Sequence, residues 1–233
     1  MTVSRRLTIV NVKGLHARAS AKLVEVVEAH DARAQISRDG MSTGGDSIMG
    51  LLMLAASNGH YEVIKLLIDN GANIKLKDSY GTTALIVAST SGNTEIAATL
   101  IDLGADPLLK DTSGGSALSN ATFFGHTETV KTLLKGVKIL PDADGQELLM
   151  LSAGLGHIEI ANALFDKGVT ANARGTDRHT AILAATAFNR VEMVKLLLKH
   201  GADPTLKDDD GINAVQLASE KEFQEIIKLL KPN

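Results

Sequence analysis

The sequence contains no cysteine and no tryptophan, and only 3% of its 233 residues are aromatic. Without cysteine the chain forms no disulfide and no thiolate metal site, which fits a reducing compartment, so we expect a cytoplasmic protein. Because aromatic side chains are so few, the 44% of hydrophobic residues must build a core from many small aliphatic contacts. Stacked helical units provide contacts of that kind.

The sequence also has no large excess of one charge and no long apolar run. The formal net charge is −3 and both signs are mixed along the chain, so no basic stripe is offered to nucleic acid. No apolar stretch reaches membrane-spanning length, and the arginines near the start are not followed by a signal-peptide core. We therefore expect a soluble protein that binds neither nucleic acid nor membrane.

What the sequence does contain is a period of about 33 residues. A first column of loop glycines has these members: Gly59, Gly92, Gly125 and Gly156, with Asn189 in the fifth place. A second column has these: Gly71, Gly104, Gly136, Gly168 and Gly201. Two columns with one spacing predict a small unit stacked on copies of itself.

Each unit is predicted to hold a turn and two helices. In the clearest copy, Asp78 and Gly81 mark a turn, and residues 84–90 form a short helix rich in small side chains. Residues 94–103 form a second helix with apolar residues on one face, and Gly104 ends it in a left-handed conformation. We expect the other copies to follow the same plan.

Some copies depart from this plan. The turn glycines are Gly81, Gly114, Gly145 and Gly211, with Asp177 standing in their place in the fifth copy. The third copy ends its second helix one residue early, at Gly136. We expect such departures to disturb local turns and to leave the fold unchanged.

The repeated pattern resembles the ankyrin repeat over about residues 52–230, most clearly in the blocks ALIVASTSGNTEIAATLIDLGADP and AILAATAFNRVEMVKLLLKHGADP. The resemblance implies a mainly α solenoid of about five repeats, occupying residues 49–231 and closed by a charged C-terminal cap, LASEKEFQEIIKLLKPN. It also implies a scaffold that binds another protein on its concave face and needs no cofactor.

The residue before the loop glycine is large and apolar in three consecutive copies, as Phe124, Leu155 and Phe188. Two interpretations remain open. These side chains either pack on the loop of the neighbouring unit, or form an exposed stripe that anchors a protein partner.

Histidines recur beside the loop glycine, as His60, His126 and His157. Three copies spaced about 30 residues apart cannot converge on one ion, so we expect no metal site. The ankyrin resemblance implies instead that such a histidine bonds to loop backbone. The sequence offers no partner for His30, His179 or His200, and we expect His200, just before Gly201, to interact with the dipole at the C-terminus of its helix.

The first 50 or so residues do not follow the period. Residues 6–12 alternate like a strand, residues 17–29 have helical spacing, and residues 32–43 are typical of a hairpin. The motifs GLHARAS, at 14–20, and DSIMGLLMLAAS, at 46–57, resemble the phosphocarrier HPr of the bacterial sugar phosphotransferase system. The resemblance covers about residues 1–57.

The HPr resemblance implies three functional residues. His16 would accept phosphate through Enzyme I, Arg18 would stabilise it, and Ser47 would be a regulatory phosphorylation site. An imidazole at a helix N-terminus is well placed to carry phosphate. Ser47 has a second interpretation, as the N-cap of the helix that follows it.

The HPr pattern stops where the repeats begin, because NGHYEVIKLLIDNGANI replaces the fourth strand and third helix of that family. We therefore expect a truncated α+β segment over residues 1–48. Two functions stay open: a scaffold with a vestigial N-terminal segment, or a phosphocarrier or phosphate-gated adaptor with phosphohistidine at His16. Residues 58–233 contain no recognisable catalytic set, so we expect no enzyme activity from the repeats.

Overall fold

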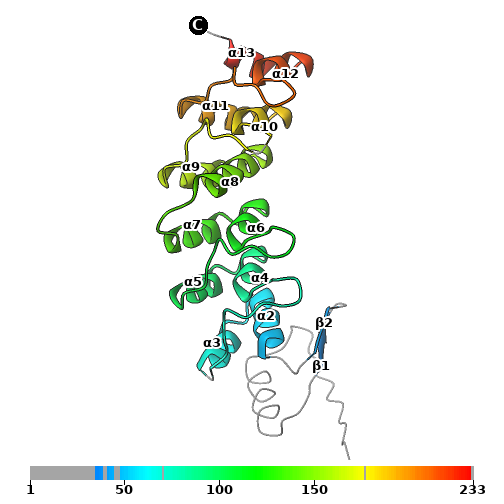
Figure 1. Ribbon diagram of the computed structural model, residues 1–233, viewed down its shortest axis with the longest axis vertical. Coiled ribbons are helices and arrows are strands. Elements are labelled where there is room, and N and C mark those ends of the chain that lie inside the picture. The colour runs from blue at the N-terminus through cyan, green and yellow to red at the C-terminus, as the bar shows by residue number, and fades with distance from the viewer. Residues whose placement is uncertain (1–34, 39–40, 45–47, 70, 176, 232–233) are drawn as a thin grey trace, which may run out of the picture.

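A computed structural model describes residues 35–38, 41–44, 48–69, 71–175 and 177–231 (Figure 1). These residues form an elongated stack of helix pairs with a short hairpin at one end. The strand predicted at residues 6–12 and the helix predicted at 17–29 lie outside the described residues.

The hairpin consists of β1 (Gln35–Arg38) and β2 (Met41–Gly44), which pair antiparallel with Gln35 opposite Gly44. This confirms the hairpin predicted over residues 32–43. It is followed in the chain by the first helix of the stack.

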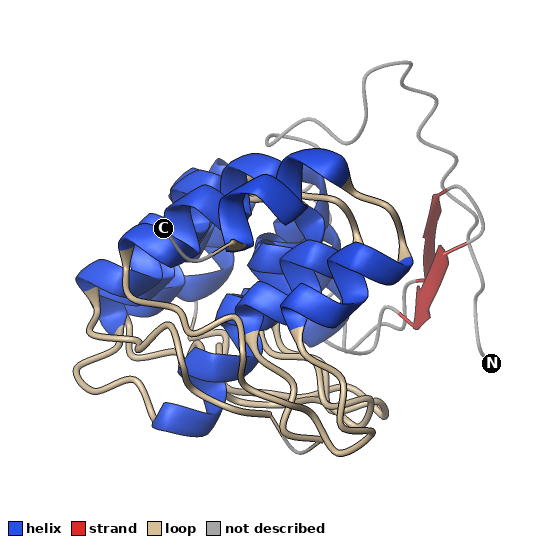
Figure 2. Cartoon of the chain, turned by 90° about the horizontal axis from the view of Figure 1, so that it is seen from above, coloured by secondary structure: helices blue, strands red, loops and turns tan. Residues whose placement is uncertain are grey.

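The described helices form six successive pairs. They are α2 (Ile48–Asn58) with α3 (Tyr61–Asp69), α4 (Ala84–Thr90) with α5 (Thr94–Asp102), α6 (Ala117–Phe123) with α7 (Thr127–Gly136), α8 (Asp142–Leu155) with α9 (Ile158–Asp166), α10 (Ala181–Ala187) with α11 (Val191–Lys199), and α12 (Ala214–Glu220) with α13 (Gln224–Leu230). Seen along the stack, the loops that connect one pair to the next gather on one side (Figure 2). The mainly α solenoid is confirmed.

The core is one continuous cluster of aliphatic side chains that runs through all the pairs. Second helices place apolar residues one turn apart, so that α5 buries Ile96 and Leu100 while α7 buries Val130 and Leu133. Among the described residues, no aromatic side chain belongs to the fully buried core. The core is therefore filled by many Leu, Ile, Val and Ala side chains, as the low aromatic content of the sequence predicts.

The first glycine column behaves as predicted. Its four glycines have φ between 71° and 83°, and Asn189 takes up the same left-handed conformation at φ 52°. Asparagine adopts this conformation more readily than most residues with a Cβ. Every loop between a first and a second helix from α2 to α11 thus turns in the same way.

The second column is uniform except at Gly136. Its other four members have φ between 79° and 88° and end their helices, whereas Gly136 is the helical last residue of α7. The predicted early end at Gly136 is confirmed, but the helix ends there without the left-handed conformation expected from the other copies. Glycine is required there for a close approach, because a Cβ would lie 2.6 Å from Cγ2 of Ile101.

The prediction for Asp177 is wrong by one residue. The left-handed residue at this turn is Arg178, with φ 54°, and its N–H donates to the carbonyl of Gly175. The N–H of Gly81 donates to the carbonyl of Asp78 in the same manner. The hydrogen-bond pattern therefore aligns Arg178, and not Asp177, with the turn glycine.

Gly145 is not a turn residue at all. It is buried inside α8, the longest helix of the described stack, which begins at Asp142 directly after Pro141. The backbone of Pro141 has φ −60°, and the carboxylates of Asp142 and Asp144 lie in the first turn, both of which favour a helix start. The fourth pair consequently lacks the hairpin turn that precedes the second, third, fifth and sixth pairs.

Candidate functional site

Exposed phenylalanines gather where first helices end. Phe124 closes α6 and is 54% exposed, while Phe188 closes α10 and is 64% exposed. Leu155, at the end of α8, is half-buried. The three residues that the repeat register aligns therefore differ, with two largely open to solvent and one partly covered.

Phe123 belongs to the same surface and was missed by the sequence reasoning. It is 52% exposed, and its ring meets that of Phe124 edge to face with centroids 5.1 Å apart. Two consecutive phenylalanines before Gly125 could have indicated in the sequence that both belong to this surface. We call the surface formed by Phe123, Phe124, Leu155 and Phe188 the aromatic column.

Phe188 fits both interpretations of this column, since it packs on the neighbouring unit and is also exposed. Its ring lies over Gly154 of α8, where a Cβ would be 3.4 Å from two ring carbons. Gly154 is buried and so provides the flat backbone surface on which the ring rests. One part of Phe188 thus packs on the neighbouring unit while most of it stays exposed.

The loops under the column are held by side chains that reach back to the preceding unit. Nδ2 of Asn93 donates to the carbonyl of Ala56 at 2.6 Å, and Nε2 of His126 lies 3.0 Å from the carbonyl of Thr90. Arg190 plays the same part, because its Nε donates to Gly154. The expected bond from a histidine to loop backbone is therefore present at His126.

His157 occupies the equivalent place in the fourth unit but is bonded differently. Its ring lies against Gly125, where a Cβ would be 2.7 Å from Cε1. Its Nε2 is buried and has no hydrogen-bond partner in the described part of the chain. This histidine therefore contributes to the position of the loop between α8 and α9 through packing and not through a hydrogen bond of Nε2.

Two of the three histidines that lacked a partner in the sequence have one in the structure, and the third, His30, lies outside the described residues. Nε2 of His179 lies 3.2 Å from Oδ2 of Asp208, which is almost fully buried. The ring of His200 stacks on Phe165 with centroids 3.9 Å apart. Within the described ranges, no three His, Cys, Asp or Glu residues are grouped as a metal site would need.

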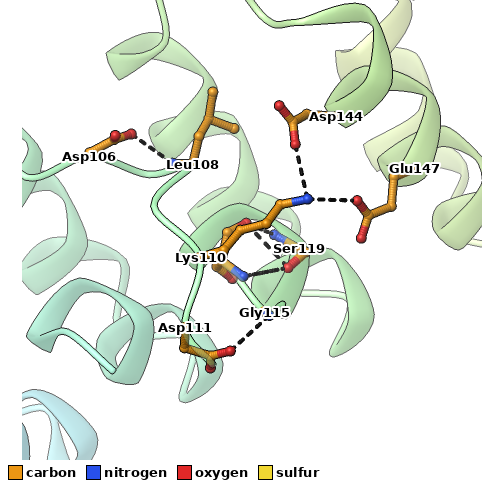
Figure 3. A network of polar contacts seen from close by, with 9 residues as sticks. Asp106, Leu108, Lys110, Asp111, Gly115, Ser119, Asp144 and Glu147 are labelled. Carbon is orange, nitrogen blue, oxygen red and sulfur yellow. Dashed lines mark hydrogen bonds and ion pairs between the residues drawn. The ribbon is translucent and has the colours of Figure 1, made fainter. Parts of the chain in front are cut away.

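A charge network joins the turn that precedes α6 to the start of α8 (Figure 3). Nζ of Lys110 donates to Glu147 at 3.1 Å and lies 3.3 Å from a carboxylate oxygen of Asp144, both in α8. The hydrogen bond to Glu147 raises the pKa of Lys110 above 10.5. The associated stability is present below pH 10.5 and is lost as pH rises through the folded-state pKa. Because the Lys110 side chain is 44% exposed, the contribution of this network to stability is small.

The phosphate-site residues implied by the HPr resemblance, His16, Arg18 and Ser47, lie outside the described residues. In the part of the chain that the structure does describe, no helix is both long enough and apolar enough to span a bilayer.

Comparison with known proteins places the repeats in context. The family model for ankyrin repeats (3 copies) matches residues 42–111, 104–175 and 149–233. An ankyrin repeat domain from Acinetobacter baumannii AYE is 33% identical with a TM-score of 0.69, covering 77% of this chain and 95% of that one. A chain from the complex of the predatory endopeptidase Bd0816 of Bdellovibrio bacteriovorus with immunity protein Bd3460 is 27% identical with a TM-score of 0.68, covering 77% and 96%.

Curated proteins match different parts of the chain. Phosphocarrier protein HPr from Xylella fastidiosa (strain Temecula1) is 42% identical over 67 residues, which make up 29% of this chain and 73% of that protein. The chain spans only 3% and 6% of the length of two longer curated relatives, both from Caenorhabditis elegans.

Proposed function

The chain belongs to the ankyrin repeat family, and from this premise we propose that it is a protein-binding scaffold whose partner contacts the aromatic column. The observation that carries the proposal is the exposure of Phe124 and Phe188, at 54% and 64%, in a chain with so few aromatic residues. Exposed aromatic side chains are the usual anchors of protein interfaces.

Several features make this column suited to binding. Its residues sit next to loops whose His126 and Arg190 bond to the last turn of the preceding first helix, at Thr90 and Gly154, so little order has to be gained on binding. The column extends over three consecutive units, from α6 to α10. A rigid apolar surface of this kind fits a partner that presents its own apolar side chains.

The test is a variant in which Phe123, Phe124 and Phe188 are all replaced by serine. We expect partner affinity to fall about a hundredfold, because removing interface anchors costs about 2 kcal/mol or more. The melting temperature should change little, since more than half of each side chain is already exposed. Affinity is measured by calorimetry on the protein that immobilised wild-type chain retains from cell extract.

The matched control replaces Leu76 and Leu103 by serine, because these residues are 43% and 46% exposed but lie outside the column. The control should bind the partner like the wild type. Equal loss of binding in both variants, or a large drop in melting temperature for the phenylalanine variant alone, contradicts the proposal.

The similarity to HPr supports a second function for residues 1–48 as a unit separate from the array at 49–231. We propose that His16 in this unit carries a phosphoryl group received from Enzyme I, that Arg18 stabilises it, and that Ser47 is the regulatory site. An Arg guanidinium is well suited to hold phosphate oxygens.

Incubation with Enzyme I and labelled phosphoenolpyruvate tests this second function. We expect an acid-labile label on the wild-type chain and none on the variant His16→Ala. Absence of label on the wild type, or a label that survives in the variant, contradicts it. The scaffold proposal is unaffected by either result, because the aromatic column lies in the array.

A further inference from the structure

The first helices at the two ends of the stack differ in their burial. At the C-terminal end, α12 packs on α10 and leaves Gln216, Ser219 and Glu220 exposed. At the other end, α2 packs on α4 from one side in the same way (Figure 1). Nevertheless, no residue of α2 between 49 and 58 is exposed. The burial of α2 is therefore that of a helix inside the stack.

The sequence of α2 agrees with this burial. Its residues, IMGLLMLAASN, include no charged side chain, and Leu51 and Leu52 are fully buried. The same is true of α4, ALIVAST, which lies between α2 and α6 and exposes no residue. A helix that is apolar on every side has to be covered on every side, and the end of a repeat array needs either a polar face or a cap. The outer side of α2, away from α4, consequently requires a cover.

The hairpin shows from which part of the chain this cover comes. The strand β2 contacts α2, so the hairpin lies at this end of the stack (Figure 1). Each of its strands has four residues, and a two-stranded hairpin of this size has too little apolar surface to cover a helix alone. Residues 1–34 precede β1 directly, so they reach the same end of the stack.

The segment before β1 has an apolar face of the kind that α2 needs. In the helix predicted at residues 17–29, helical spacing places Leu23, Val24 and Val27 on one side, and Lys22 and Glu25 on the other. Such an amphipathic helix needs an apolar surface to pack on, and the outer side of α2 is one.

A second copy of the chain fits the outer side of α2 less well. A head-to-tail contact would place the C-terminal end of the stack on α2, and that end exposes Gln216 and Glu220. Burying these polar groups against an apolar helix is unfavourable. A head-to-head contact between two copies of α2 would instead give a dimer, which the oligomeric state reveals.

We propose that residues 1–34 dock on the outer side of α2 through Leu23, Val24 and Val27, and so cap the array. The segment that contains His16 is then fixed at one end of the stack, and the N-terminal unit and the repeats form one body. Neither the scaffold function nor the carrier function requires this contact, so the proposal stands apart from both.

Amide hydrogen exchange of the full chain, followed by NMR, tests the contact. Val27→Asp places a carboxylate in the apolar contact, so exchange in α2 should become at least about tenfold faster. The increase should fade along the stack and be absent in α12, because each repeat contacts only its neighbours. Val27→Ala removes apolar surface without adding a charge, and should accelerate exchange in α2 about threefold.

The matched control is Ala29→Asp, which adds the same carboxylate on the charged side of the predicted helix. It should leave exchange in α2 at the wild-type rate. Sedimentation equilibrium accompanies these measurements, and we expect a monomer in which α2 is equally protected at every protein concentration.

Unchanged exchange of α2 in both Val27 variants overturns the proposal, and so does an equal acceleration in Ala29→Asp. Acceleration of the same size in α2 and α12 overturns it too, since that would reflect a loss of stability in the whole chain. If α2 is protected only at concentrations where the chain dimerises, a second copy provides the cover and the proposal is wrong.

Discussion

Replacing Leu133 by alanine is expected to lower the free energy of unfolding by about 2 to 5 kcal/mol. Leu133 lies in α7 with no exposed surface, in the continuous aliphatic core that passes through every pair. Alanine leaves a cavity that neighbouring helices fill only in part, because aliphatic side chains pack closely on both sides. Urea unfolding followed by circular dichroism gives the difference.

Leu103→Ala is the matched control for this substitution. Leu103 follows α5 directly and is 46% exposed, so truncation removes little buried surface and should cost less than about 1 kcal/mol. Similar losses in the two variants would mean that stacking of the second helices does not stabilise the chain.

Replacing Gly92 by alanine is expected to cost about 3 kcal/mol, through two separate effects. Its φ of 71° is strained by about 1 to 2 kcal/mol for a residue with a Cβ. The new Cβ would also lie 2.8 Å from Nδ1 of His126, so the ring must move and its hydrogen bond to the carbonyl of Thr90 is lost. Losing that bond and repacking the ring adds about 1 to 3 kcal/mol.

Gly104→Ala isolates the backbone effect. Gly104 has φ 85°, and nothing lies within 4 Å of the Cβ it would acquire. This control should therefore lose only the strain, about 1 to 2 kcal/mol. If both alanine variants lose the same stability in urea unfolding, the inter-unit contact of His126 contributes nothing.

The period in the sequence was enough to predict the helix pairs and the left-handed loops, including Asn189 in a position otherwise held by glycine. Repeats make such predictions reliable, because each position is read several times in one chain. The bond from His126 to loop backbone followed from the family resemblance and is confirmed.

The presence of a glycine in the sequence does not show whether it is needed for a positive φ or for a close contact. Gly81 and Gly104 have positive φ, whereas Gly136 and Gly145 are helical and are needed where another side chain comes close. A residue letter cannot distinguish these two reasons, since one is a property of the backbone and the other of a neighbouring unit. For the same reason, the sequence could not show that the turn before α8 is missing, because Gly145 stands where the other copies have a turn glycine.

The exposure of the aromatic column depends even more strongly on residues of the neighbouring unit. The exposure of Phe188 is set partly by Gly154, which lies in the preceding unit and provides the surface under its ring. No spacing rule within one unit predicts this arrangement.

Small-angle X-ray scattering tests most directly whether the repeats form one elongated stack that can present a continuous binding face. We expect a folded chain with a skewed distance distribution and a radius of gyration clearly above the value of about 17 Å for a compact globule of this length. A symmetric distribution with a radius of gyration near that value would contradict the stack and the surface proposed on it.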